Sequence, residues 1–457
     1  MRVRITPGLI ETGSVRVPGD KSIAHRWLIL ATTARGTSRL LGLPPSLDVR
    51  STAACLAKVS ARSGPALEAW ALNAGGAAEG HGSTWNPHDL DASEQLLEVE
   101  GEGRSGLLES SDDLDCGNSG TAMRLLAGML ATVPFASTLV GDESLSARPM
   151  ERVAVPIREM GAVVRTTDGH APITIEGGGL RGTASSLPSP SAQVKGAILF
   201  AGLGAEGTTV VIEPAPTRDH TERAFAALGL PVSIDGSTIT LRGGSEHEAF
   251  TATVPGDPSS AAFLVAAAAL SGVELSITGV GLNPSRLHYL EVLSRMGVRT
   301  RITVEREELG EPVGELWVAP DAELVGTEVG VDELPLIIDE VPALALLATH
   351  ARGETWFSEV GELRVKESDR MAGITRGIVA MGGHAGAEGD DLVVSGLGLR
   401  GGSADAQGDH RLAMAFAVAA LRANTACEVS GIEAADVSFP GFLSVMRELG
   451  ASVGPRS

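Results

Sequence analysis

A pattern that recurs six times along the 457 residues is the feature that most constrains the fold of this chain. Each copy begins with Gly, Ser and Asp, continues as an apolar Ala/Leu-rich helix, breaks at Gly or Asn and ends in a Thr/Val-rich strand. Self-similarity of this kind is typical of repeat architectures. The six helices are predicted at residues 23–34, 121–131, 193–203, 259–270, 341–350 and 410–421.

A second amphipathic helix, ending at a glycine, follows in several copies. These helices are predicted at residues 150–160, 221–228, 287–296 and 368–381, each before a stretch of strand-like alternation. The repeated unit is therefore βαβαββ in character. Because one such unit cannot bury its own sheet and helices, six units predict two pseudo-symmetric halves of three.

The first and fourth copies are the most alike, PGDKSIAHRWLIL beside PGDPSSAAFLVAA, and they indicate a duplication boundary near Pro255. We expect an N-terminal lobe of three repeats over 18–255 and a C-terminal lobe of three repeats over 256–457. Strand 1–17 would pair with the second lobe, so the chain would cross between lobes near Pro18 and Pro255. The Gly-rich, acidic stretch 75–104 has low periodicity and is interpreted as an insertion or surface loop.

Composition favours a packed, unexported protein. Apolar residues make up 43% and charged residues 20% of the chain, enough for buried cores. The 3 cysteines cannot form a disulfide framework and have no metal-ligand spacing. The N-terminus has no signal-peptide apolar region, and the longest apolar stretch, 260–270, is too short to span a membrane. We expect a cytoplasmic protein without a membrane span.

The charge distribution indicates what the chain can bind. A net charge of −21 opposes binding to nucleic acid or to anionic membranes by bulk attraction. An anionic ligand must therefore be held by a local cluster of cations. Among 36 basic residues the only lysines are Lys21, Lys58, Lys195 and Lys366. Because lysine, unlike arginine, can give up a proton, lysines in an arginine-rich chain are candidates for chemistry.

Three of the predicted helices carry a cation in their first turns, where free backbone N–H groups favour anions. Lys21 with Arg26, Arg124, and Lys195 occupy these places. Each one alone is an ordinary capped helix start with a surface cation. Three in register favour a shared anionic ligand between the lobes. At a fourth helix start, Asp339 is either a cap or a base.

Nine motifs together resemble the 5-enolpyruvylshikimate-3-phosphate synthase family over nearly the full length. They are PGDKSIAHR (18–26), GNSGTAMR (117–124), ARP (147–149), SAQVK (191–195), RDHTE (218–222), IDE (338–340), RVKESDR (364–370), GDHRLAM (408–414) and SFPGF (438–442). The resemblance implies an α/β (α+β) fold, a two-lobed inside-out barrel with three βαβαββ repeats in each lobe. It also implies transfer of the enolpyruvyl group of phosphoenolpyruvate to the 5-hydroxyl of shikimate 3-phosphate, with release of phosphate. This is a step of chorismate and aromatic amino acid biosynthesis. The family needs no metal or organic cofactor, and we expect a monomer.

The resemblance also implies a role for each matching residue. For shikimate 3-phosphate these are Lys21, Ser22, Arg26, Ser191, Ala192, Gln193, Thr217, Arg218, Asp339 and Lys366. For phosphoenolpyruvate they are Lys21, Gly120, Arg148, Gln193, Arg370 and Arg411. Asp339 would accept the hydroxyl proton, and Glu367 and Lys21 are candidates for proton transfer at C3 and at the departing phosphate.

The chain departs from the family pattern at several positions. Val437 stands where many members have lysine, and Glu362 where those members have asparagine. NPSR (283–286) resembles the class II branch, with Ser285 in place of the usual Thr. Gly120 is kept, whereas some glyphosate-tolerant members have alanine, so the inhibitor response stays open.

Two other functions were weighed. The related enolpyruvyl transferase that acts on a UDP-amino sugar has an Asn after its first lysine and a loop cysteine as acid. Here Ser22 follows Lys21, and Cys116 lies at a helix start, where a buried small residue is expected. A non-catalytic anion-binding protein would explain the cations, but not the carboxylates Asp339 and Glu367 beside them.

Overall fold

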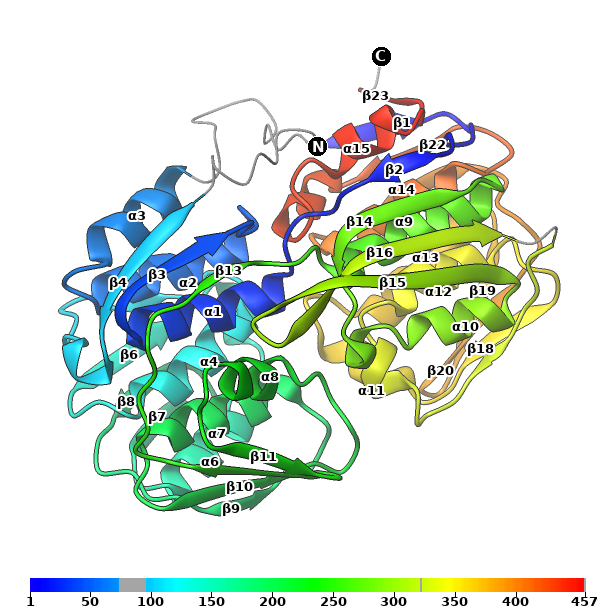
Figure 1. Ribbon diagram of the computed structural model, residues 1–457. Helices are drawn as coiled ribbons and strands as arrows, with labels where there is room; N and C mark the ends of the chain where they lie inside the picture. The colour runs from blue at the N-terminus through cyan, green and yellow to red at the C-terminus, as the bar shows by residue number, and fades with distance from the viewer. Residues whose placement is uncertain (74–95, 321–322, 456–457) are drawn as a thin grey trace.

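The computed structural model describes residues 1–73, 96–320 and 323–455. Figure 1 shows two lobes side by side, one built from the first half of the chain and one from the second. Within the described residues the strands form six sheets, which agrees with the six predicted repeats. Their strand orders are β13-β3-β4, β5-β6-β8-β7, β11-β12-β10-β9, β15-β16-β14-β2, β17-β18-β20-β19 and β21-β22-β1-β23.

The first lobe is built from elements that follow β2. Its helices are α1 (Lys21–Thr33), α2 (Leu47–Lys58), α3 (Gly64–Asn73), α4 (Gly120–Leu130), α5 (Glu143–Ser146), α6 (Glu151–Glu159), α7 (Ala192–Gly204) and α8 (His220–Ala227). Its strands are β3 (Arg35–Leu41), β4 (Leu97–Glu102), β5 (Leu114–Asp115), β6 (Ala136–Val140), β7 (Val163–Thr167), β8 (His170–Glu176), β9 (Ala184–Ser186), β10 (Thr208–Ile212), β11 (Val232–Asp235), β12 (Thr238–Arg242) and β13 (Thr251–Thr253).

The second lobe takes the rest of the chain and both termini. Its helices are α9 (Pro258–Ser271), α10 (Tyr289–Arg295), α11 (Leu334–Ile337), α12 (Val341–Ala348), α13 (Arg370–Ala380), α14 (His410–Ala420) and α15 (Phe442–Glu448), with short 3-10 turns η2 (Pro284–Arg286), η3 (Val360–Val365) and η4 (Ile432–Val437). Its strands are β1 (Arg2–Ile5), β2 (Gly13–Val15), β14 (Leu275–Gly281), β15 (Val298–Glu308), β16 (Glu311–Pro320), β17 (Glu328–Val329), β18 (Glu354–Phe357), β19 (His384–Glu388), β20 (Asp391–Ser395), β21 (Gly402–Asp405), β22 (Cys427–Ser430) and β23 (Val453–Pro455).

The six predicted central helices are confirmed as α1, α4, α7, α9, α12 and α14, with ends that differ by only a few residues. They form the buried interior of the lobes, and all residues of α9 and α12 are buried. Short polar side chains start several of these helices by accepting backbone N–H groups of the first turn, as Asp20, Ser119 and Ser191 do. The starts are therefore polar and have charged neighbours, while the helix bodies are apolar.

The two lobes exchange a strand where the chain crosses between them. In four repeats a central strand pairs in parallel with the strand before its own helix, as β9 and β10 do around α7. In the other two repeats, the first of each lobe, the parallel partner strand precedes the first helix of the opposite lobe. β2, which precedes α1, pairs with β14 of the second lobe, and β13, which precedes α9, pairs with β3 of the first lobe. The N-terminal segment therefore pairs with the second half, as predicted, through both β1 and β2.

The hydrophobic residues form two separate cores. One contains residues from Ile23 to Val254, and the other contains residues 3–17 together with residues from Ala261 onwards. The crossings lie between these cores, where the Asp20 N–H donates to Pro255 O (2.7 Å) and the Asp257 N–H donates to Pro18 O (2.8 Å). We propose lobe boundaries at 18–255 and 256–457 on this basis.

One sequence interpretation was wrong. The stretch 75–104 is not a loop throughout, because residues 97–102 form strand β4, which pairs with β3 along its whole length. The alternation Leu-Glu-Val-Glu-Gly-Glu, with the apolar residues buried, is the strand signal that the surrounding glycines concealed. The rest of the stretch up to residue 95 lies outside the described residues. Helices α2 and α3 were also missed. The described residues contain no helix long and apolar enough to cross a membrane.

Candidate active site

A cavity of about 370 Å³ opens between the lobes. Nine of the predicted site residues line it: Arg148, Ser191, Ala192, Gln193, Thr217 and Arg218 from the first lobe, and Asp339, Lys366 and Glu367 from the second. Lys21, Ser22, Arg26, Gly120, Arg370 and Arg411 are not on this lining. Most of these six contact residues that are, as described below.

The first-lobe wall is organised by the starts of α4 and α7. Ser191 caps α7 by accepting the Val194 N–H (3.3 Å), which places Ala192 and Gln193 at the first turn. The Gln193 amide donates to Thr121 Oγ (2.9 Å) and accepts a hydrogen bond from Arg124. The two helix starts are therefore joined directly beside the cavity.

Asp339, on the second-lobe wall, pairs with three arginines. It lies just before α12 and forms ion pairs with Arg218 (2.7 Å), Arg370 (3.3 Å) and Arg411 (3.5 Å). Burial by itself raises the pKa of Asp339, but the positive charges of Arg411, Arg218, Lys366 and Arg370 hold that pKa well below its usual value. The carboxylate is therefore ionised and can accept a proton.

Glu367 lies on the same side of the cavity, in the segment before α13. Its carboxylate pairs with Arg370 (2.6 Å) and lies 4.0 Å from Arg148 of the opposite lobe. Burial opposes ionisation of Glu367, yet Arg370 and Arg148 lower its pKa well below the usual range. Arg370 itself is fully buried and also pairs with Asp409 (2.8 Å), so it holds both candidate catalytic carboxylates in place.

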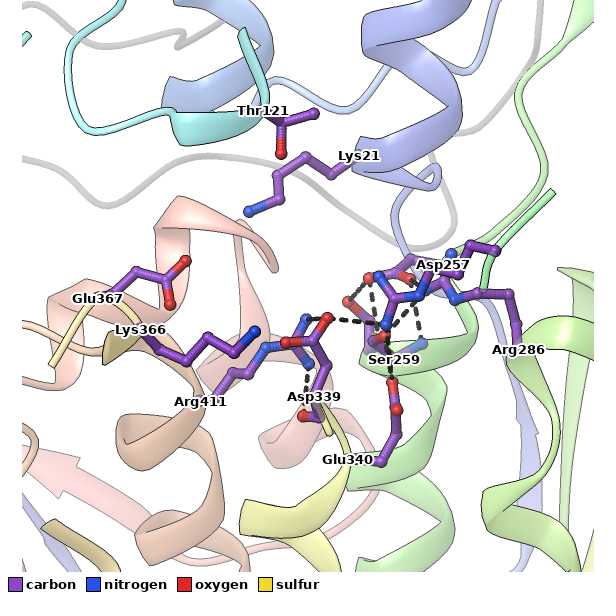
Figure 2. A network of polar contacts seen from close by, with 12 residues as sticks. Lys21, Thr121, Asp257, Ser259, Arg286, Asp339, Glu340, Lys366, Glu367 and Arg411 are labelled. Carbon is purple, nitrogen blue, oxygen red and sulfur yellow. Dashed lines mark hydrogen bonds and ion pairs between the residues drawn. The ribbon is translucent and has the colours of Figure 1, made fainter. Parts of the chain in front are cut away.

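Lys21 begins α1 and points its ammonium group from the first lobe toward the space between the lobes, where Figure 2 places Glu367 and Lys366 on the facing side. Its nitrogen forms an ion pair with Asp48 of α2 (2.8 Å). Lys21 is close enough to Glu367 for its charge to lower the pKa of that carboxyl. A first-lobe carboxylate therefore holds the lysine ammonium group in place.

Among the predicted residues that do not line the cavity, Arg26, Gly120 and Arg411 lie against residues that do. Arg26 is buried, donates to Ser22 O (2.7 Å) and Thr221 Oγ (2.8 Å), and reaches Ala192 O (3.5 Å). Gly120 lies beside two arginines, because a Cβ at this position would be 2.7 Å from Arg124 Nη1 and 3.3 Å from Arg148 Nη1. Thr217 donates its hydroxyl hydrogen bond to Glu213, and Arg411 donates to Asp339 O (2.9 Å).

Lys195, one of the predicted helix-start cations, does not face the cavity. Lys195 is buried inside the first lobe, where it pairs with Glu213 (2.8 Å) and Glu222 (2.7 Å). Lys195 lies two positions beyond Gln193 on α7, so it points away from the face that Gln193 presents. The expectation that Lys195 faces a shared ligand was therefore wrong. Its ion pairs with Glu213 and Glu222 instead hold α7 to the neighbouring segments.

Two lining arginines, Arg124 and Arg152, are not among the residues to which the resemblance assigns a role, although Arg124 is one of the predicted helix-start cations. Arg124 is buried in the first lobe, and burial together with Arg152 and Arg148 lowers its pKa to about 10. Arg152 reaches across the cavity to Glu362 (3.8 Å), which also lies 3.6 Å from Lys366. Arg152 stands in the first turn of α6, whereas Arg148 lies in the turn between α5 and α6, so helical spacing could not link the two residues. Glu362 was noticed only as a departure from a family pattern.

Two histidines of the motifs, His25 and His220, and the three cysteines are buried in the structure. His25 contacts Thr52 (2.6 Å) and His220 contacts Glu311 (2.8 Å). Cys55, Cys116 and Cys427 are buried free thiols. Within the described residues no group of three or more His, Cys, Asp or Glu side chains is arranged to hold a metal ion.

Comparison with known proteins identifies relatives over the whole chain. The family EPSP synthase (3-phosphoshikimate 1-carboxyvinyltransferase) matches residues 7–65 and 85–446. The 3-phosphoshikimate 1-carboxyvinyltransferase of Acidithiobacillus ferrooxidans is 44% identical over 450 residues, covering 98% of each chain. That of Desulfitobacterium hafniense is 43% identical over 455 residues, again covering 98% of each chain.

Solved structures agree. An EPSP synthase from Acinetobacter baumannii superposes with a TM-score of 0.80 at 37% identity and covers 99% of both chains. The enolpyruvyl transferase NikO from Streptomyces tendae shares the fold, with a TM-score of 0.74 at 20% identity, over 99% of this chain and 98% of its own. With two lobes of three repeats, a cation-lined cavity between them and relatives of this identity over its full length, the chain belongs to the EPSP synthase family.

Proposed function

We propose that the protein transfers the enolpyruvyl group of phosphoenolpyruvate to the 5-hydroxyl of shikimate 3-phosphate and releases phosphate. The observation that carries the proposal is that Arg148, Arg218, Arg370 and Arg411 converge on Asp339 and Glu367, two carboxylates that line one cavity. Each substrate has a carboxylate and a phosphate, so two bound substrates bring several negative charges. The cations of both lobes can offset them although the whole chain is acidic.

The substrates are assigned to residues by the family resemblance, and each substrate would contact residues of both lobes. Shikimate 3-phosphate would lie against Lys21, Ser22, Arg26, Ser191, Ala192, Gln193, Thr217, Arg218, Asp339 and Lys366. Phosphoenolpyruvate would lie against Lys21, Gly120, Arg148, Gln193, Arg370 and Arg411. Arginine forks match the planar carboxylate and the phosphate of phosphoenolpyruvate.

The chemistry needs one proton acceptor and one proton donor. The 5-hydroxyl oxygen bonds to C2 of phosphoenolpyruvate while C3 gains a proton, and the tetrahedral intermediate then loses phosphate from C2 and a proton from C3, which restores the C2–C3 double bond. Asp339 accepts the hydroxyl proton, since its carboxylate is ionised and lines the cavity. Glu367 and Lys21 carry the proton transfers at C3 and at the departing phosphate. The arginines stabilise the charge of the intermediate in a cavity closed by both lobes.

Phosphate release from the pure protein tests this function. Phosphate is expected only when phosphoenolpyruvate and shikimate 3-phosphate are both present, with the carboxyvinyl ether as co-product in mass spectrometry. Release with a UDP-amino sugar instead would indicate the related transferase. Tight binding of both anions without any phosphate would indicate a non-catalytic binding protein.

We also propose that the protein acts as a monomer in the cytoplasm. Size-exclusion chromatography with light scattering is expected to give a mass near 46.9 kDa. A mass of twice that value would contradict the monomer.

A further inference from the structure

A buried polar network lies where the chain crosses between the lobes, outside the cavity lining. Its centre is Arg286 of η2, which is 2% exposed. The guanidinium donates to the carboxylates of Asp20 and Asp257, the latter at 2.8 Å. These two aspartates occupy matching positions in the first and fourth repeats, and they cap α1 and α9. One arginine therefore holds the starts of two equivalent helices, one from each lobe.

The network continues from Arg286 toward the reacting carboxylate. Arg286 Nη2 donates to Ser259 Oγ (2.8 Å), and the Ser259 hydroxyl donates to Glu340 Oε1. Figure 2 shows this succession, with Ser259 between Arg286 and Glu340, and Asp339 beside Glu340. A serine oxygen that accepts from the guanidinium has its proton free for the carboxylate, so the direction of both hydrogen bonds is fixed.

Glu340 lies in a position to disturb Asp339. Its carboxylate is 1% exposed, and within the described residues Ser259 is the one hydrogen-bond donor that contacts it. It also lies 3.9 Å from Arg218, the arginine that pairs with Asp339 at 2.7 Å. Without the serine hydroxyl, the nearest positive group to which the Glu340 carboxylate can turn is Arg218. Glu340 would then compete with Asp339 for that guanidinium.

We propose that Arg286, Ser259 and Glu340 form a positioning relay that fixes the Arg218–Asp339 pair relative to the crossing between the lobes. The relay rests on the proposed function, in which Asp339 accepts the hydroxyl proton. None of the three residues touches the substrates, and each acts through Asp339 and Arg218. The relay also ties the start of α1, which carries Lys21, to the segment that carries Asp339. One buried arginine thereby positions both Lys21 of the first lobe and Asp339 of the second lobe.

The chain offers a matched pair of serines for the test. Ser259 and Ser260 are both buried in the first turn of α9, and Asp257 accepts the backbone N–H of each. The Ser260 hydroxyl donates to Asp257 (2.9 Å) and is not part of the path to Glu340. Ser259→Ala and Ser260→Ala thus remove the same group from adjacent positions, and both are expected to lower the melting temperature.

Steady-state kinetics separate the relay from a structural role. Ser259→Ala is expected to lower kcat about ten- to hundred-fold, because a small misplacement of a reacting group costs this much. The KM for phosphoenolpyruvate should stay within about two-fold, since none of its proposed ligands is touched. Ser260→Ala should keep kcat within about two-fold of the unmodified protein. Glu340→Ala should lower kcat as much as Ser259→Ala does, and the double variant should lower kcat no further than either single variant. Glu340→Gln can still accept a hydrogen bond from Ser259, so it should keep most of the kcat of the unmodified protein.

Equal kcat in Ser259→Ala and Ser260→Ala, with an active unmodified protein, would overturn the relay and leave the proposed function standing. No turnover in the unmodified protein would instead overturn the proposed function. The relay is then judged by a crystal structure of Ser259→Ala, in which the Arg218–Asp339 contact is expected to lengthen and Glu340 to approach Arg218. An unchanged Arg218–Asp339 contact in that variant would overturn the relay.

Discussion

At the scale of single residues, two of the four lysines, Lys21 and Lys366, and several arginines lie around one cavity. An acidic protein repels anions at long range, but buried or partly buried pairs are screened far less than surface charges. Asp339, Glu367 and Asp48 form ion pairs with these cations. Negatively charged substrates can take over the same cations without leaving them unpaired.

Lys21→Arg tests whether Lys21 is more than a positive charge. Arginine keeps the charge but cannot give up a proton at working pH, so we expect kcat to fall by about 100-fold or more. Lys58→Arg is the matched control, because Lys58 lies exposed at the end of α2 and donates to a backbone carbonyl, Asp113 O. Near-normal kcat in Lys21→Arg would contradict an acid–base role for Lys21.

Residues of the site differ in how far the sequence could predict them. Ser191, Gln193 and Asp339 stand in short motifs at helix starts, where the local chain direction already sets their exposure. Lys195 stands in the same kind of motif, yet it pairs with Glu213 and Glu222 inside the lobe. The partners of Lys195 lie 18 and 27 positions away, and only the packing of α7 against β10 and α8 brings them together.

At the scale of elements, the close contact between α4 and α7 aligns the first-lobe wall. Gly128 of α4 has no room for a side chain, because a Cβ there would lie 2.1 Å from Ala197 O. The contact brings Thr121 and Gln193 within 2.9 Å at the start of the same two helices. The register between α4 and α7 is therefore decided by one glycine in the middle of the contact.

Gly128→Ala is expected to destabilise the protein by about 1–3 kcal/mol, since forced overpacking outweighs the better helix propensity of alanine. Chemical denaturation would measure the loss, and the KM for shikimate 3-phosphate should rise as the Gln193 wall shifts. Gly386→Ala is the control, because a Cβ at Gly386 meets nothing within 4 Å. Equal midpoints for both variants would argue against the tight helix contact.

A second element-level feature predicts a pH dependence. Glu151 joins α6 to β7 through Arg158 (2.7 Å) and Thr166 (2.5 Å), and these hydrogen bonds lower its pKa to about 2. Because the folded pKa lies below the unfolded value near 4.5, this contribution to stability is present above about pH 5 and is lost as the pH falls toward 2.

Glu151→Gln should therefore lower the melting temperature by about 1–2 °C at pH 7, the size expected for a partly exposed ion pair. The difference in melting temperature between Glu151→Gln and the unmodified protein should narrow as the pH falls to about 3.5. At this pH the Glu151 carboxylate is protonated in the unfolded chain before it is protonated in the folded protein. Glu159→Gln, on the exposed side of the same helix, should show no such convergence. A gap that stays constant with pH would contradict the ion pair as its cause.

At the scale of the whole molecule, the lobes are linked in two ways. The crossings exchange β2 and β13 and carry the Arg286 network. The cavity is bridged by ion pairs between the lobes, Arg218–Asp339, Arg152–Glu362 and Arg148–Glu367. The crossings are buried and independent of substrate, whereas the bridging pairs line the space that substrates would occupy.

We expect the binding of shikimate 3-phosphate to weaken clearly between 50 and 500 mM KCl, because the Debye length falls from roughly 14 to 4 Å over this range. Calorimetric titration would measure it, and saturating ligand should raise the melting temperature by mass action. Shikimate without the phosphate should show a smaller salt effect. Equal salt dependence of the two ligands would contradict a cation cluster as the source of affinity.

The sequence by itself determined the six repeats, their central helices and most of the polar residues at the helix starts, because periodicity and capping are local properties of the chain. It could not determine which of these residues meet. The strand exchange, the pairing of Asp339 with Arg218 and the diversion of Lys195 depend on contacts between distant segments. Only tertiary packing decides such contacts, since a motif fixes where a side chain leaves the backbone and the opposing lobe fixes what it reaches.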